Sequence, residues 1–186
     1  MNNIKSIAFT VMSLAVFASC NQKQVKESPA QKVEVKTVKP EYFLGESINK
    51  LVQDGVAEFN MQGEAKYTLI NKLFANIQFS EVGINYYRNE YDKVRNVCYA
   101  SLVSTKEIDV RYAQIKSFMR DKYGEPAKES RFYSDNGVAR YTNTLWDKGF
   151  YAISLYATEP LQGENGSIIA VFTITEDIQA FNTFFQ

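Results

Sequence analysis

Residues 104–146, STKEIDVRYAQIKSFMRDKYGEPAKESRFYSDNGVARYTNTLW, decide the fold class, because the hydrophobic period changes once within them. Up to Tyr123 the apolar residues recur at the spacing of a helix, and from Lys128 onward they alternate with polar residues, as in a strand. The stretch therefore predicts a helix followed by antiparallel strands.

The helix has recognisable start and stop signals. Ser104, with Glu107 three residues later, has the pattern of a capping box. Gly124 is expected to end the helix, and Pro126 prevents it from resuming. Between these signals one apolar stripe recurs at helical spacing, formed by Ile108, Tyr112, Ile115, Phe118 and Met119.

Strands with short turns follow this helix. Strands are expected over residues 128–134, 138–146, 150–157 and 167–174. Asn136-Gly137 suits a two-residue type I′ turn, and Asp147-Lys148-Gly149 suits a three-residue turn with glycine in the left-handed conformation. The last strand is almost wholly apolar, which is typical of a central strand.

The preceding part of the chain has a similar order of elements. A short helix is expected over residues 47–53, ending at Asp54-Gly55, followed by strands over 67–79, 82–88 and 93–103, with a turn at 89–92. The tail, 175–186, predicts a final short helix. The fold class is therefore α+β, with antiparallel sheet and one or two packed helices. Residues 41–186 are expected to form one domain, composed of two similar helix-plus-meander halves, 41–103 and 104–186.

The predicted turns fix a register, and with it two sheet faces. One face collects Arg131, Tyr133, Arg140, Thr142, Thr144, Trp146, Phe150 and Tyr156, with Trp146 opposite Phe150 and Tyr133 opposite Arg140. The other face is more apolar and is expected to pack on Ile115 and Phe118 of the helix; it collects Phe132, Tyr141, Leu145, Tyr151, Ile153 and Leu155.

The first face predicts a partner-binding surface, because aromatic residues and arginine are enriched where proteins bind one another. Its candidate residues are Arg131, Tyr133, Arg140, Trp146, Phe150 and Tyr156. Two other interpretations stay open. The same residues can form cross-strand pairs that stabilise an exposed sheet, or the first half of the domain can cover them.

The beginning of the chain has the pattern of a targeting segment. Lys5 is followed by an apolar run too short to span a bilayer, and then by Phe17-Ala18-Ser19-Cys20. These residues resemble the lipobox of bacterial lipoproteins. The resemblance implies removal of residues 1–19, acylation of Cys20 with chains such as palmitate, and anchoring in the outer membrane of a Gram-negative bacterium, facing the periplasm. Residues 20–40 lack aromatic side chains and predict a flexible tether.

A second resemblance concerns the domain. The helix that closes on Lys122-Tyr123-Gly124-Glu125-Pro126, followed by a meander that contains Trp146, is similar to many small bacterial lipoproteins of unknown function. The two helix-plus-meander halves are similar in element order to the β-lactamase inhibitor protein. This resemblance is one of fold, so inhibition enters only as an alternative function.

Composition argues against several classes of function. The chain has 21 basic and 21 acidic residues, so no basic field would attract nucleic acid. The chain has no histidine, so serine–histidine and cysteine–histidine catalysis and histidine-ligated metal sites are excluded. Cys98 lies in an alternating apolar run and predicts a core thiol. Acidic pairs such as Glu125 with Glu129, or Glu159 with Glu164, are the remaining catalytic candidates, and no cofactor is expected.

The expected function is therefore non-catalytic: a lipoprotein of the bacterial envelope that binds a protein or has a structural role. Three alternatives remain. The same face could inhibit a periplasmic enzyme, or bind glycan or peptidoglycan through Trp146 and the tyrosines. The least favoured is a carboxylate-based hydrolase.

Overall fold

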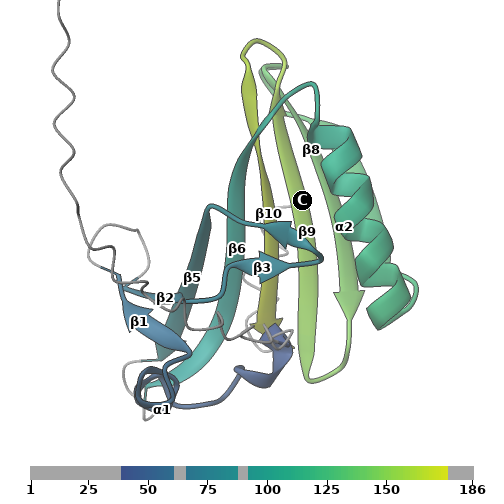
Figure 1. Cartoon of the computed structure of the whole chain (residues 1–186). Helices are drawn as coiled ribbons and strands as arrows, with labels where there is room; N and C mark the ends of the chain where they lie inside the picture. Colours follow the sequence, from purple (N-terminus) through teal and green to yellow (C-terminus); the bar gives the residue numbers. More distant parts are fainter. Residues whose placement is uncertain (1–38, 61–65, 88–91, 176–186) are drawn as a thin grey trace, which may run out of the picture. The chain divides into compact units, whose positions relative to one another are not determined.

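The computed structural model describes residues 39–60, 66–87 and 92–175. Predictions for the signal peptide, for Cys20 and its tether up to residue 38, for most of the turn at 89–92, and for the tail from residue 176 lie outside the described residues. Within them the expected α+β class is confirmed. They form an eight-stranded antiparallel sheet, a two-stranded sheet, two α-helices and one 3-10 helix (Figure 1).

The strands are β1 (Ala57–Phe59), β2 (Tyr67–Leu69), β3 (Leu73–Phe74), β4 (Ile77–Gln78), β5 (Glu81–Tyr87), β6 (Lys93–Ser104), β7 (Lys128–Tyr133), β8 (Ala139–Asp147), β9 (Tyr151–Pro160) and β10 (Asn165–Ile174). The helices are η1 (Pro40–Tyr42), α1 (Ile48–Gln53) and α2 (Ile108–Tyr123).

The order of strands in the large sheet is symmetric about its centre. It runs β1-β2-β5-β6-β10-β9-β8-β7, and every neighbouring pair is antiparallel. One half of this sheet consists of the four strands β1, β2, β5 and β6 and is accompanied by α1; the other half consists of β7 to β10 and is accompanied by α2. This is the order that two helix-plus-meander units would produce if their last strands paired.

Helix α2 ends at Gly124 as the sequence predicts, with a positive φ of 84° at that glycine. The expected capping box is wrong, since Glu107 is the N-cap residue and no side chain caps the helix. Ser104 is the last residue of β6, where it pairs with Asn165, so it lies too early to cap. The carboxylate of Glu107 instead contacts Arg111, at 3.5 Å.

The apolar stripe of α2 packs on the sheet as expected. Its buried residues are Ile108, Tyr112, Ile115, Met119 and Tyr123. Phe118 is partly buried against Phe74 of the β3–β4 hairpin, with ring centroids 5.6 Å apart. Figure 1 shows this hairpin crossing the same side of the sheet, where Phe74 also contacts Tyr99 and Phe172. Together, α2 and the hairpin cover one face of the sheet.

The predicted register between β7 and β8 is confirmed: Arg131 pairs with Thr142, and Tyr133 pairs with Arg140. The expected type I′ turn is wrong. Such a turn needs a positive φ at both central residues, and of Asn136 and Gly137 only Gly137 has one, of 67°. Ser134 organises the turn instead. Its Oγ accepts hydrogen bonds from the backbone N–H groups of Val138 and Ala139, at 3.0 Å each.

The predicted register between β8 and β9 is wrong. Trp146 pairs with Ile153 rather than facing Phe150, because Lys148 donates its backbone N–H to the carbonyl of Tyr151 and the turn consists of Gly149 and Phe150. The observed register differs from the predicted one by three residues. Because side chains alternate along a strand, a shift by an odd number of residues places each β9 side chain on the opposite face relative to β8. Ile153 and Leu155 therefore join Trp146 on one face, and Tyr156 lies on the other.

The predicted packing of the helix is correct for β9 and wrong for β7 and β8. The helix side of the sheet holds Ile153 and Leu155 as expected, but with Thr144 and Trp146 in place of Phe132, Tyr141 and Leu145. The hydroxyl of Tyr112 on α2 lies 2.7 Å from Thr144 Oγ1 and donates to the carbonyl of Leu155 at 3.2 Å. These two bonds place α2 directly over β8 and β9.

Candidate functional site

The register divides the six predicted partner-binding residues into two groups. Arg131, Tyr133 and Arg140 lie on the helix side of the sheet, because β7 and β8 pair as expected. Trp146 lies on the same side but is buried in the core, whereas Phe150 lies in the turn before β9 and Tyr156 lies on the opposite face. The continuous aromatic face predicted from the sequence is therefore not present.

Each of the other three residues has a different environment. Trp146 is 1% exposed and donates from Nε1 to the carbonyl of Gly124, at 2.8 Å. Phe150 is 68% exposed, but it lies in the turn before β9. Tyr156 points to the opposite face and is half-buried; burial raises the pKa of its phenol. Trp146 is thus a core residue.

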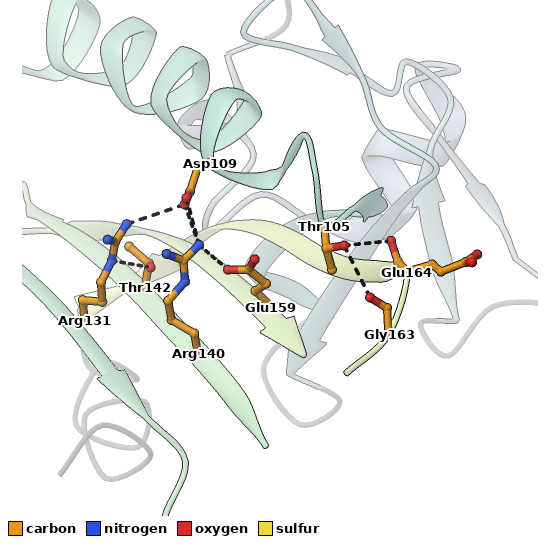
Figure 2. Close-up of polar contacts among 8 residues, drawn as sticks. All are labelled: Thr105, Asp109, Arg131, Arg140, Thr142, Glu159, Gly163 and Glu164. Carbon is orange, nitrogen blue, oxygen red and sulfur yellow. Dashed lines mark hydrogen bonds and ion pairs between the residues drawn. The ribbon is translucent and has the colours of Figure 1, made fainter. Parts of the chain in front are cut away.

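An ion-pair network surrounds Arg140 (Figure 2). Its guanidinium donates to both carboxylate oxygens of Asp109, at 2.9 Å each, and also pairs with Glu159. The hydrogen bonds that Arg140 donates to Asp109 raise the pKa of its guanidinium further above its ordinary value. Arg131 lies 3.5 Å from the same Asp109 carboxylate and donates from Nε to Thr142, at 3.4 Å. Two cations and two carboxylates balance, so the network carries no net charge.

Four elements position this network. Asp109 lies in the first turn of α2, while Arg131, Arg140 and Glu159 come from β7, β8 and β9. The N-terminus of α2 is held close to β10 at Gly166, where an added Cβ would lie only 2.7 Å from Ile108 Cδ1. The turn before α2 is fixed by the backbone N–H of Thr105, which donates to the carbonyl of Glu164, at 2.9 Å.

Apolar side chains lie beside the network, at the end of the sheet. Leu161 donates its backbone N–H to the carbonyl of Val138, at 2.8 Å, and Tyr133 pairs with Arg140 two residues further on. Tyr133, Val138 and Leu161 are each more than half exposed. We call the whole set the Arg140 surface; it consists of Asp109, Arg131, Tyr133, Val138, Arg140, Glu159 and Leu161.

Sequence reasoning missed four members of this surface. Asp109 in the first turn of a helix is an ordinary favourable charge at a helix N-terminus, and nothing in the sequence pairs it with an arginine more than 20 residues away. Glu159, Val138 and Leu161 fell in predicted loops or at strand ends. The apolar members could have been suspected as isolated hydrophobic residues beside turns.

Open clefts lie on both sides of α2. One, of about 530 Å³, lies between α2 and the strands β7 and β8; it is lined by Asp109, Tyr112, Ala113, Lys116, Glu129, Ser130, Arg131, Thr142 and Asn143. Two others, of about 580 and 340 Å³, lie between the β3–β4 hairpin and the first half of α2. The first cleft borders the Arg140 surface.

The candidate catalytic groups have other partners. Glu129 accepts from Lys116 at 2.6 Å, and Glu159 pairs with Arg140. Figure 2 shows the side chain of Glu164 directed away from Glu159. Burial, and next the carboxylate of Glu81, raise the pKa of Cys98 to about 11, so its thiol stays protonated at neutral pH. Among the described residues, no group of three potential ligands could hold a metal ion.

A scan against models of protein families found no match for this chain, and neither did a search of curated proteins. In the part of the chain that the structure describes, no helix has the length and apolar character to cross a membrane.

Proposed function

We propose that this protein is a non-catalytic lipoprotein of the bacterial envelope that binds a partner protein through the Arg140 surface. The observation that carries the proposal is the composition of that surface. Exposed Tyr133, Val138 and Leu161 lie beside two arginines held in place by carboxylates. Tyrosine and arginine are enriched among the residues that contribute most to binding at protein interfaces, and apolar neighbours such as Val138 and Leu161 can exclude water around them.

The position of the surface supports the same proposal. The described chain begins at Lys39, and the following η1 contacts β10. Burial, and next the charge of Glu41 in η1, raise the pKa of Tyr151, the first residue of β9. Leu161 follows the other end of this ten-residue strand, about 34 Å away by strand geometry. Lys39, where the described chain begins, is therefore at the end of the domain opposite to the Arg140 surface.

The neutral charge of the network favours a protein over an anionic ligand. All four charges of the network have a partner within it, so neither arginine of the network is unpaired and ready to bind phosphate or nucleic acid. Asp109 and Arg131 are largely exposed and can add specific hydrogen bonds to an apolar contact. The open clefts also lack the enclosure that small ligands need.

Two other functions were considered beside partner binding. Glycan binding is less favoured, because Trp146 is buried and Tyr133 is the only aromatic residue of the Arg140 surface. Inhibition of a periplasmic enzyme would use the same surface and remains the second candidate. The two differ in one measurement: an inhibitor would lower the activity of the protein it captures.

The test is capture of envelope proteins by the full-length chain from detergent-solubilised membranes. The test variant is Tyr133→Ser/Leu161→Ser, and the matched control is Tyr42→Ser/Phe150→Ser, which removes two equally exposed side chains near the opposite end of the domain. We expect the test variant to lose about tenfold or more of the captured partner, and the control to change little. Equal capture by both variants would refute binding at the Arg140 surface.

Anchoring is tested separately. Cys20→Ala should abolish incorporation of a labelled palmitate and release the chain from the membrane fraction, because the acyl chains supply the membrane affinity. Retention of label in this variant would refute acylation at Cys20.

A further inference from the structure

Among the residues that the structure describes, no strand pairs with the outer edge of β7, so one long edge of the large sheet is open. It is the last strand in the sheet order, and five of its six residues are exposed. The opposite edge, β1, has only three residues and contacts α1. An open edge strand has a row of backbone N–H and C=O groups that another strand can pair with.

The register identifies which groups of β7 face outward. Ser134 donates its backbone N–H to the carbonyl of Ala139, and this bond continues the β7–β8 register. In an antiparallel ladder, hydrogen-bonded pairs alternate with pairs that are not hydrogen-bonded. Counting back from Ser134, the backbone groups of Glu129, Arg131 and Tyr133 therefore point away from β8, toward the open edge.

These outward groups allow few ways to pair β7 with a second β7. In an antiparallel pair related by a twofold axis, an outward-facing residue must lie opposite another outward-facing residue. With the axis at Ser130, Glu129 of each copy faces Arg131 of the other. With the axis at Arg131, two arginines face each other, and with the axis at Glu129, two glutamates do. Only the first of these three registers places opposite charges together.

We propose that two copies of this chain associate edge to edge through β7, antiparallel, with Ser130 on the twofold axis and each Glu129 opposite Arg131 of the second copy. This inference goes beyond the proposed function and does not depend on a partner binding the Arg140 surface.

The surroundings of β7 favour this register. Lys116 holds the Glu129 carboxylate at 2.6 Å, and Asp109 lies 3.5 Å from Arg131, so both charged side chains are ordered on the helix side of the edge. On the other side, Lys128 would lie opposite Phe132, whose ring stacks on Tyr141 with centroids 5.3 Å apart. The ammonium of a lysine over such a ring is a favourable contact.

The contact is small, and this determines how it is tested. One pair of six-residue strands buries less surface than a standard interface, so the dimer is expected to be weak and to dissociate on dilution. Cross-linking of the full-length chain in the membrane, where copies share a surface, is therefore the first experiment.

A cysteine scan along β7 tests the register. Ser130→Cys places two sulfurs on the axis, between α-carbons about 4.5 Å apart, which is within the range of a disulfide. Tyr133→Cys is the matched control on the same strand, because its two copies would be about 20 Å apart. We expect a mild oxidant to give a disulfide-linked dimer with Ser130→Cys and only the wild-type background with Tyr133→Cys. The strongest cross-link at residue 131, or equal cross-links along the strand, would overturn the proposed register.

A charge exchange provides the second test and does not require a disulfide. Glu129→Arg and Arg131→Glu each place like charges opposite one another twice, and each should weaken self-association about tenfold. A mixture of the two variants restores both opposite-charge pairs and should form the heterodimer. Circular dichroism must first show that each variant is folded. Failure of the mixture to associate, or wild-type chain that stays monomeric in sedimentation up to about 1 mM, would refute the dimer.

Discussion

The guanidinium of Arg140 donates to both carboxylate oxygens of Asp109, at 2.9 Å each, and so joins β8 to the first turn of α2. The two residues are 31 positions apart in the chain. The contact connects the helix to the far end of the sheet, where the exposed apolar side chains lie.

This contact predicts a modest loss of stability when it is removed. Arg140→Ala should lower the free energy of unfolding by about 1–2 kcal/mol, because the partly buried Glu159 would lose its cation. Asp109→Asn should cost less, about 0.5 kcal/mol, since this carboxylate is largely exposed. Urea unfolding measures both. Lys50→Ala, which removes an exposed pair with Glu46, is the control and should change little.

Substitution of Trp146 should destabilise the fold strongly, and substitution of Phe150 should have little effect. Trp146→Ala removes a fully buried ring and its bond to Gly124, and should destabilise by about 3–5 kcal/mol. Phe150→Ala should stay within about 0.5 kcal/mol of wild type, because the ring is exposed in a turn. Thermal unfolding of the two variants checks the β8–β9 register. Equal effects would contradict it.

Gly166 should not tolerate a side chain. Its position admits no Cβ, because the added atom would meet the backbone of Thr158 and the Ile108 side chain. Gly166→Ala should therefore destabilise by about 1–3 kcal/mol as α2 is displaced from β10. Ser167→Ala, at the adjacent half-buried position, is the comparison and should cost less. Unfolding in urea distinguishes them.

Stability should fall at alkaline pH. Burial raises the pKa of Tyr112 from its ordinary value of 10.0 to about 12, so the folded chain retains a proton that the unfolded chain has lost. Because the folded state binds more protons between these values, stability decreases as pH rises through them, and it is unaffected below pH 10. Burial also raises the pKa values of Tyr99 and Tyr123. Tyr112→Phe should flatten the decline between about pH 10 and about pH 12, measured by urea unfolding.

The Tyr112→Phe variant also has an effect at neutral pH. It removes a buried hydroxyl that bonds to Thr144 and to the carbonyl of Leu155, and should cost about 1–2 kcal/mol. If the free energy of unfolding of Tyr112→Phe at neutral pH equals that of wild type, water replaces the hydroxyl as the partner of these groups.

Local signals in the sequence were sufficient for most elements. The apolar stripe and Gly124 predicted α2, alternation predicted the strands of the second half, and the β7–β8 pairing was correct. The prediction of two faces failed at one turn, where a two-residue turn at Gly149 and Phe150 replaced the expected three-residue turn. An odd shift places every β9 side chain on the other face relative to β8, so this one turn brought Ile153 and Leu155 onto the side of Trp146 and put Tyr156 on the opposite side.

The sequence by itself determined the α+β class, the helix α2 and the antiparallel strands, because these depend on periodicity and on glycine conformations between neighbouring residues. It also determined which chemistries lack their usual residues, since the chain has no histidine. Only the tertiary structure decided which residues share a surface. Asp109, Arg140 and Glu159 meet because α2 packs over β8 and β9, and that packing depends on strand register and on contacts between residues far apart in the chain.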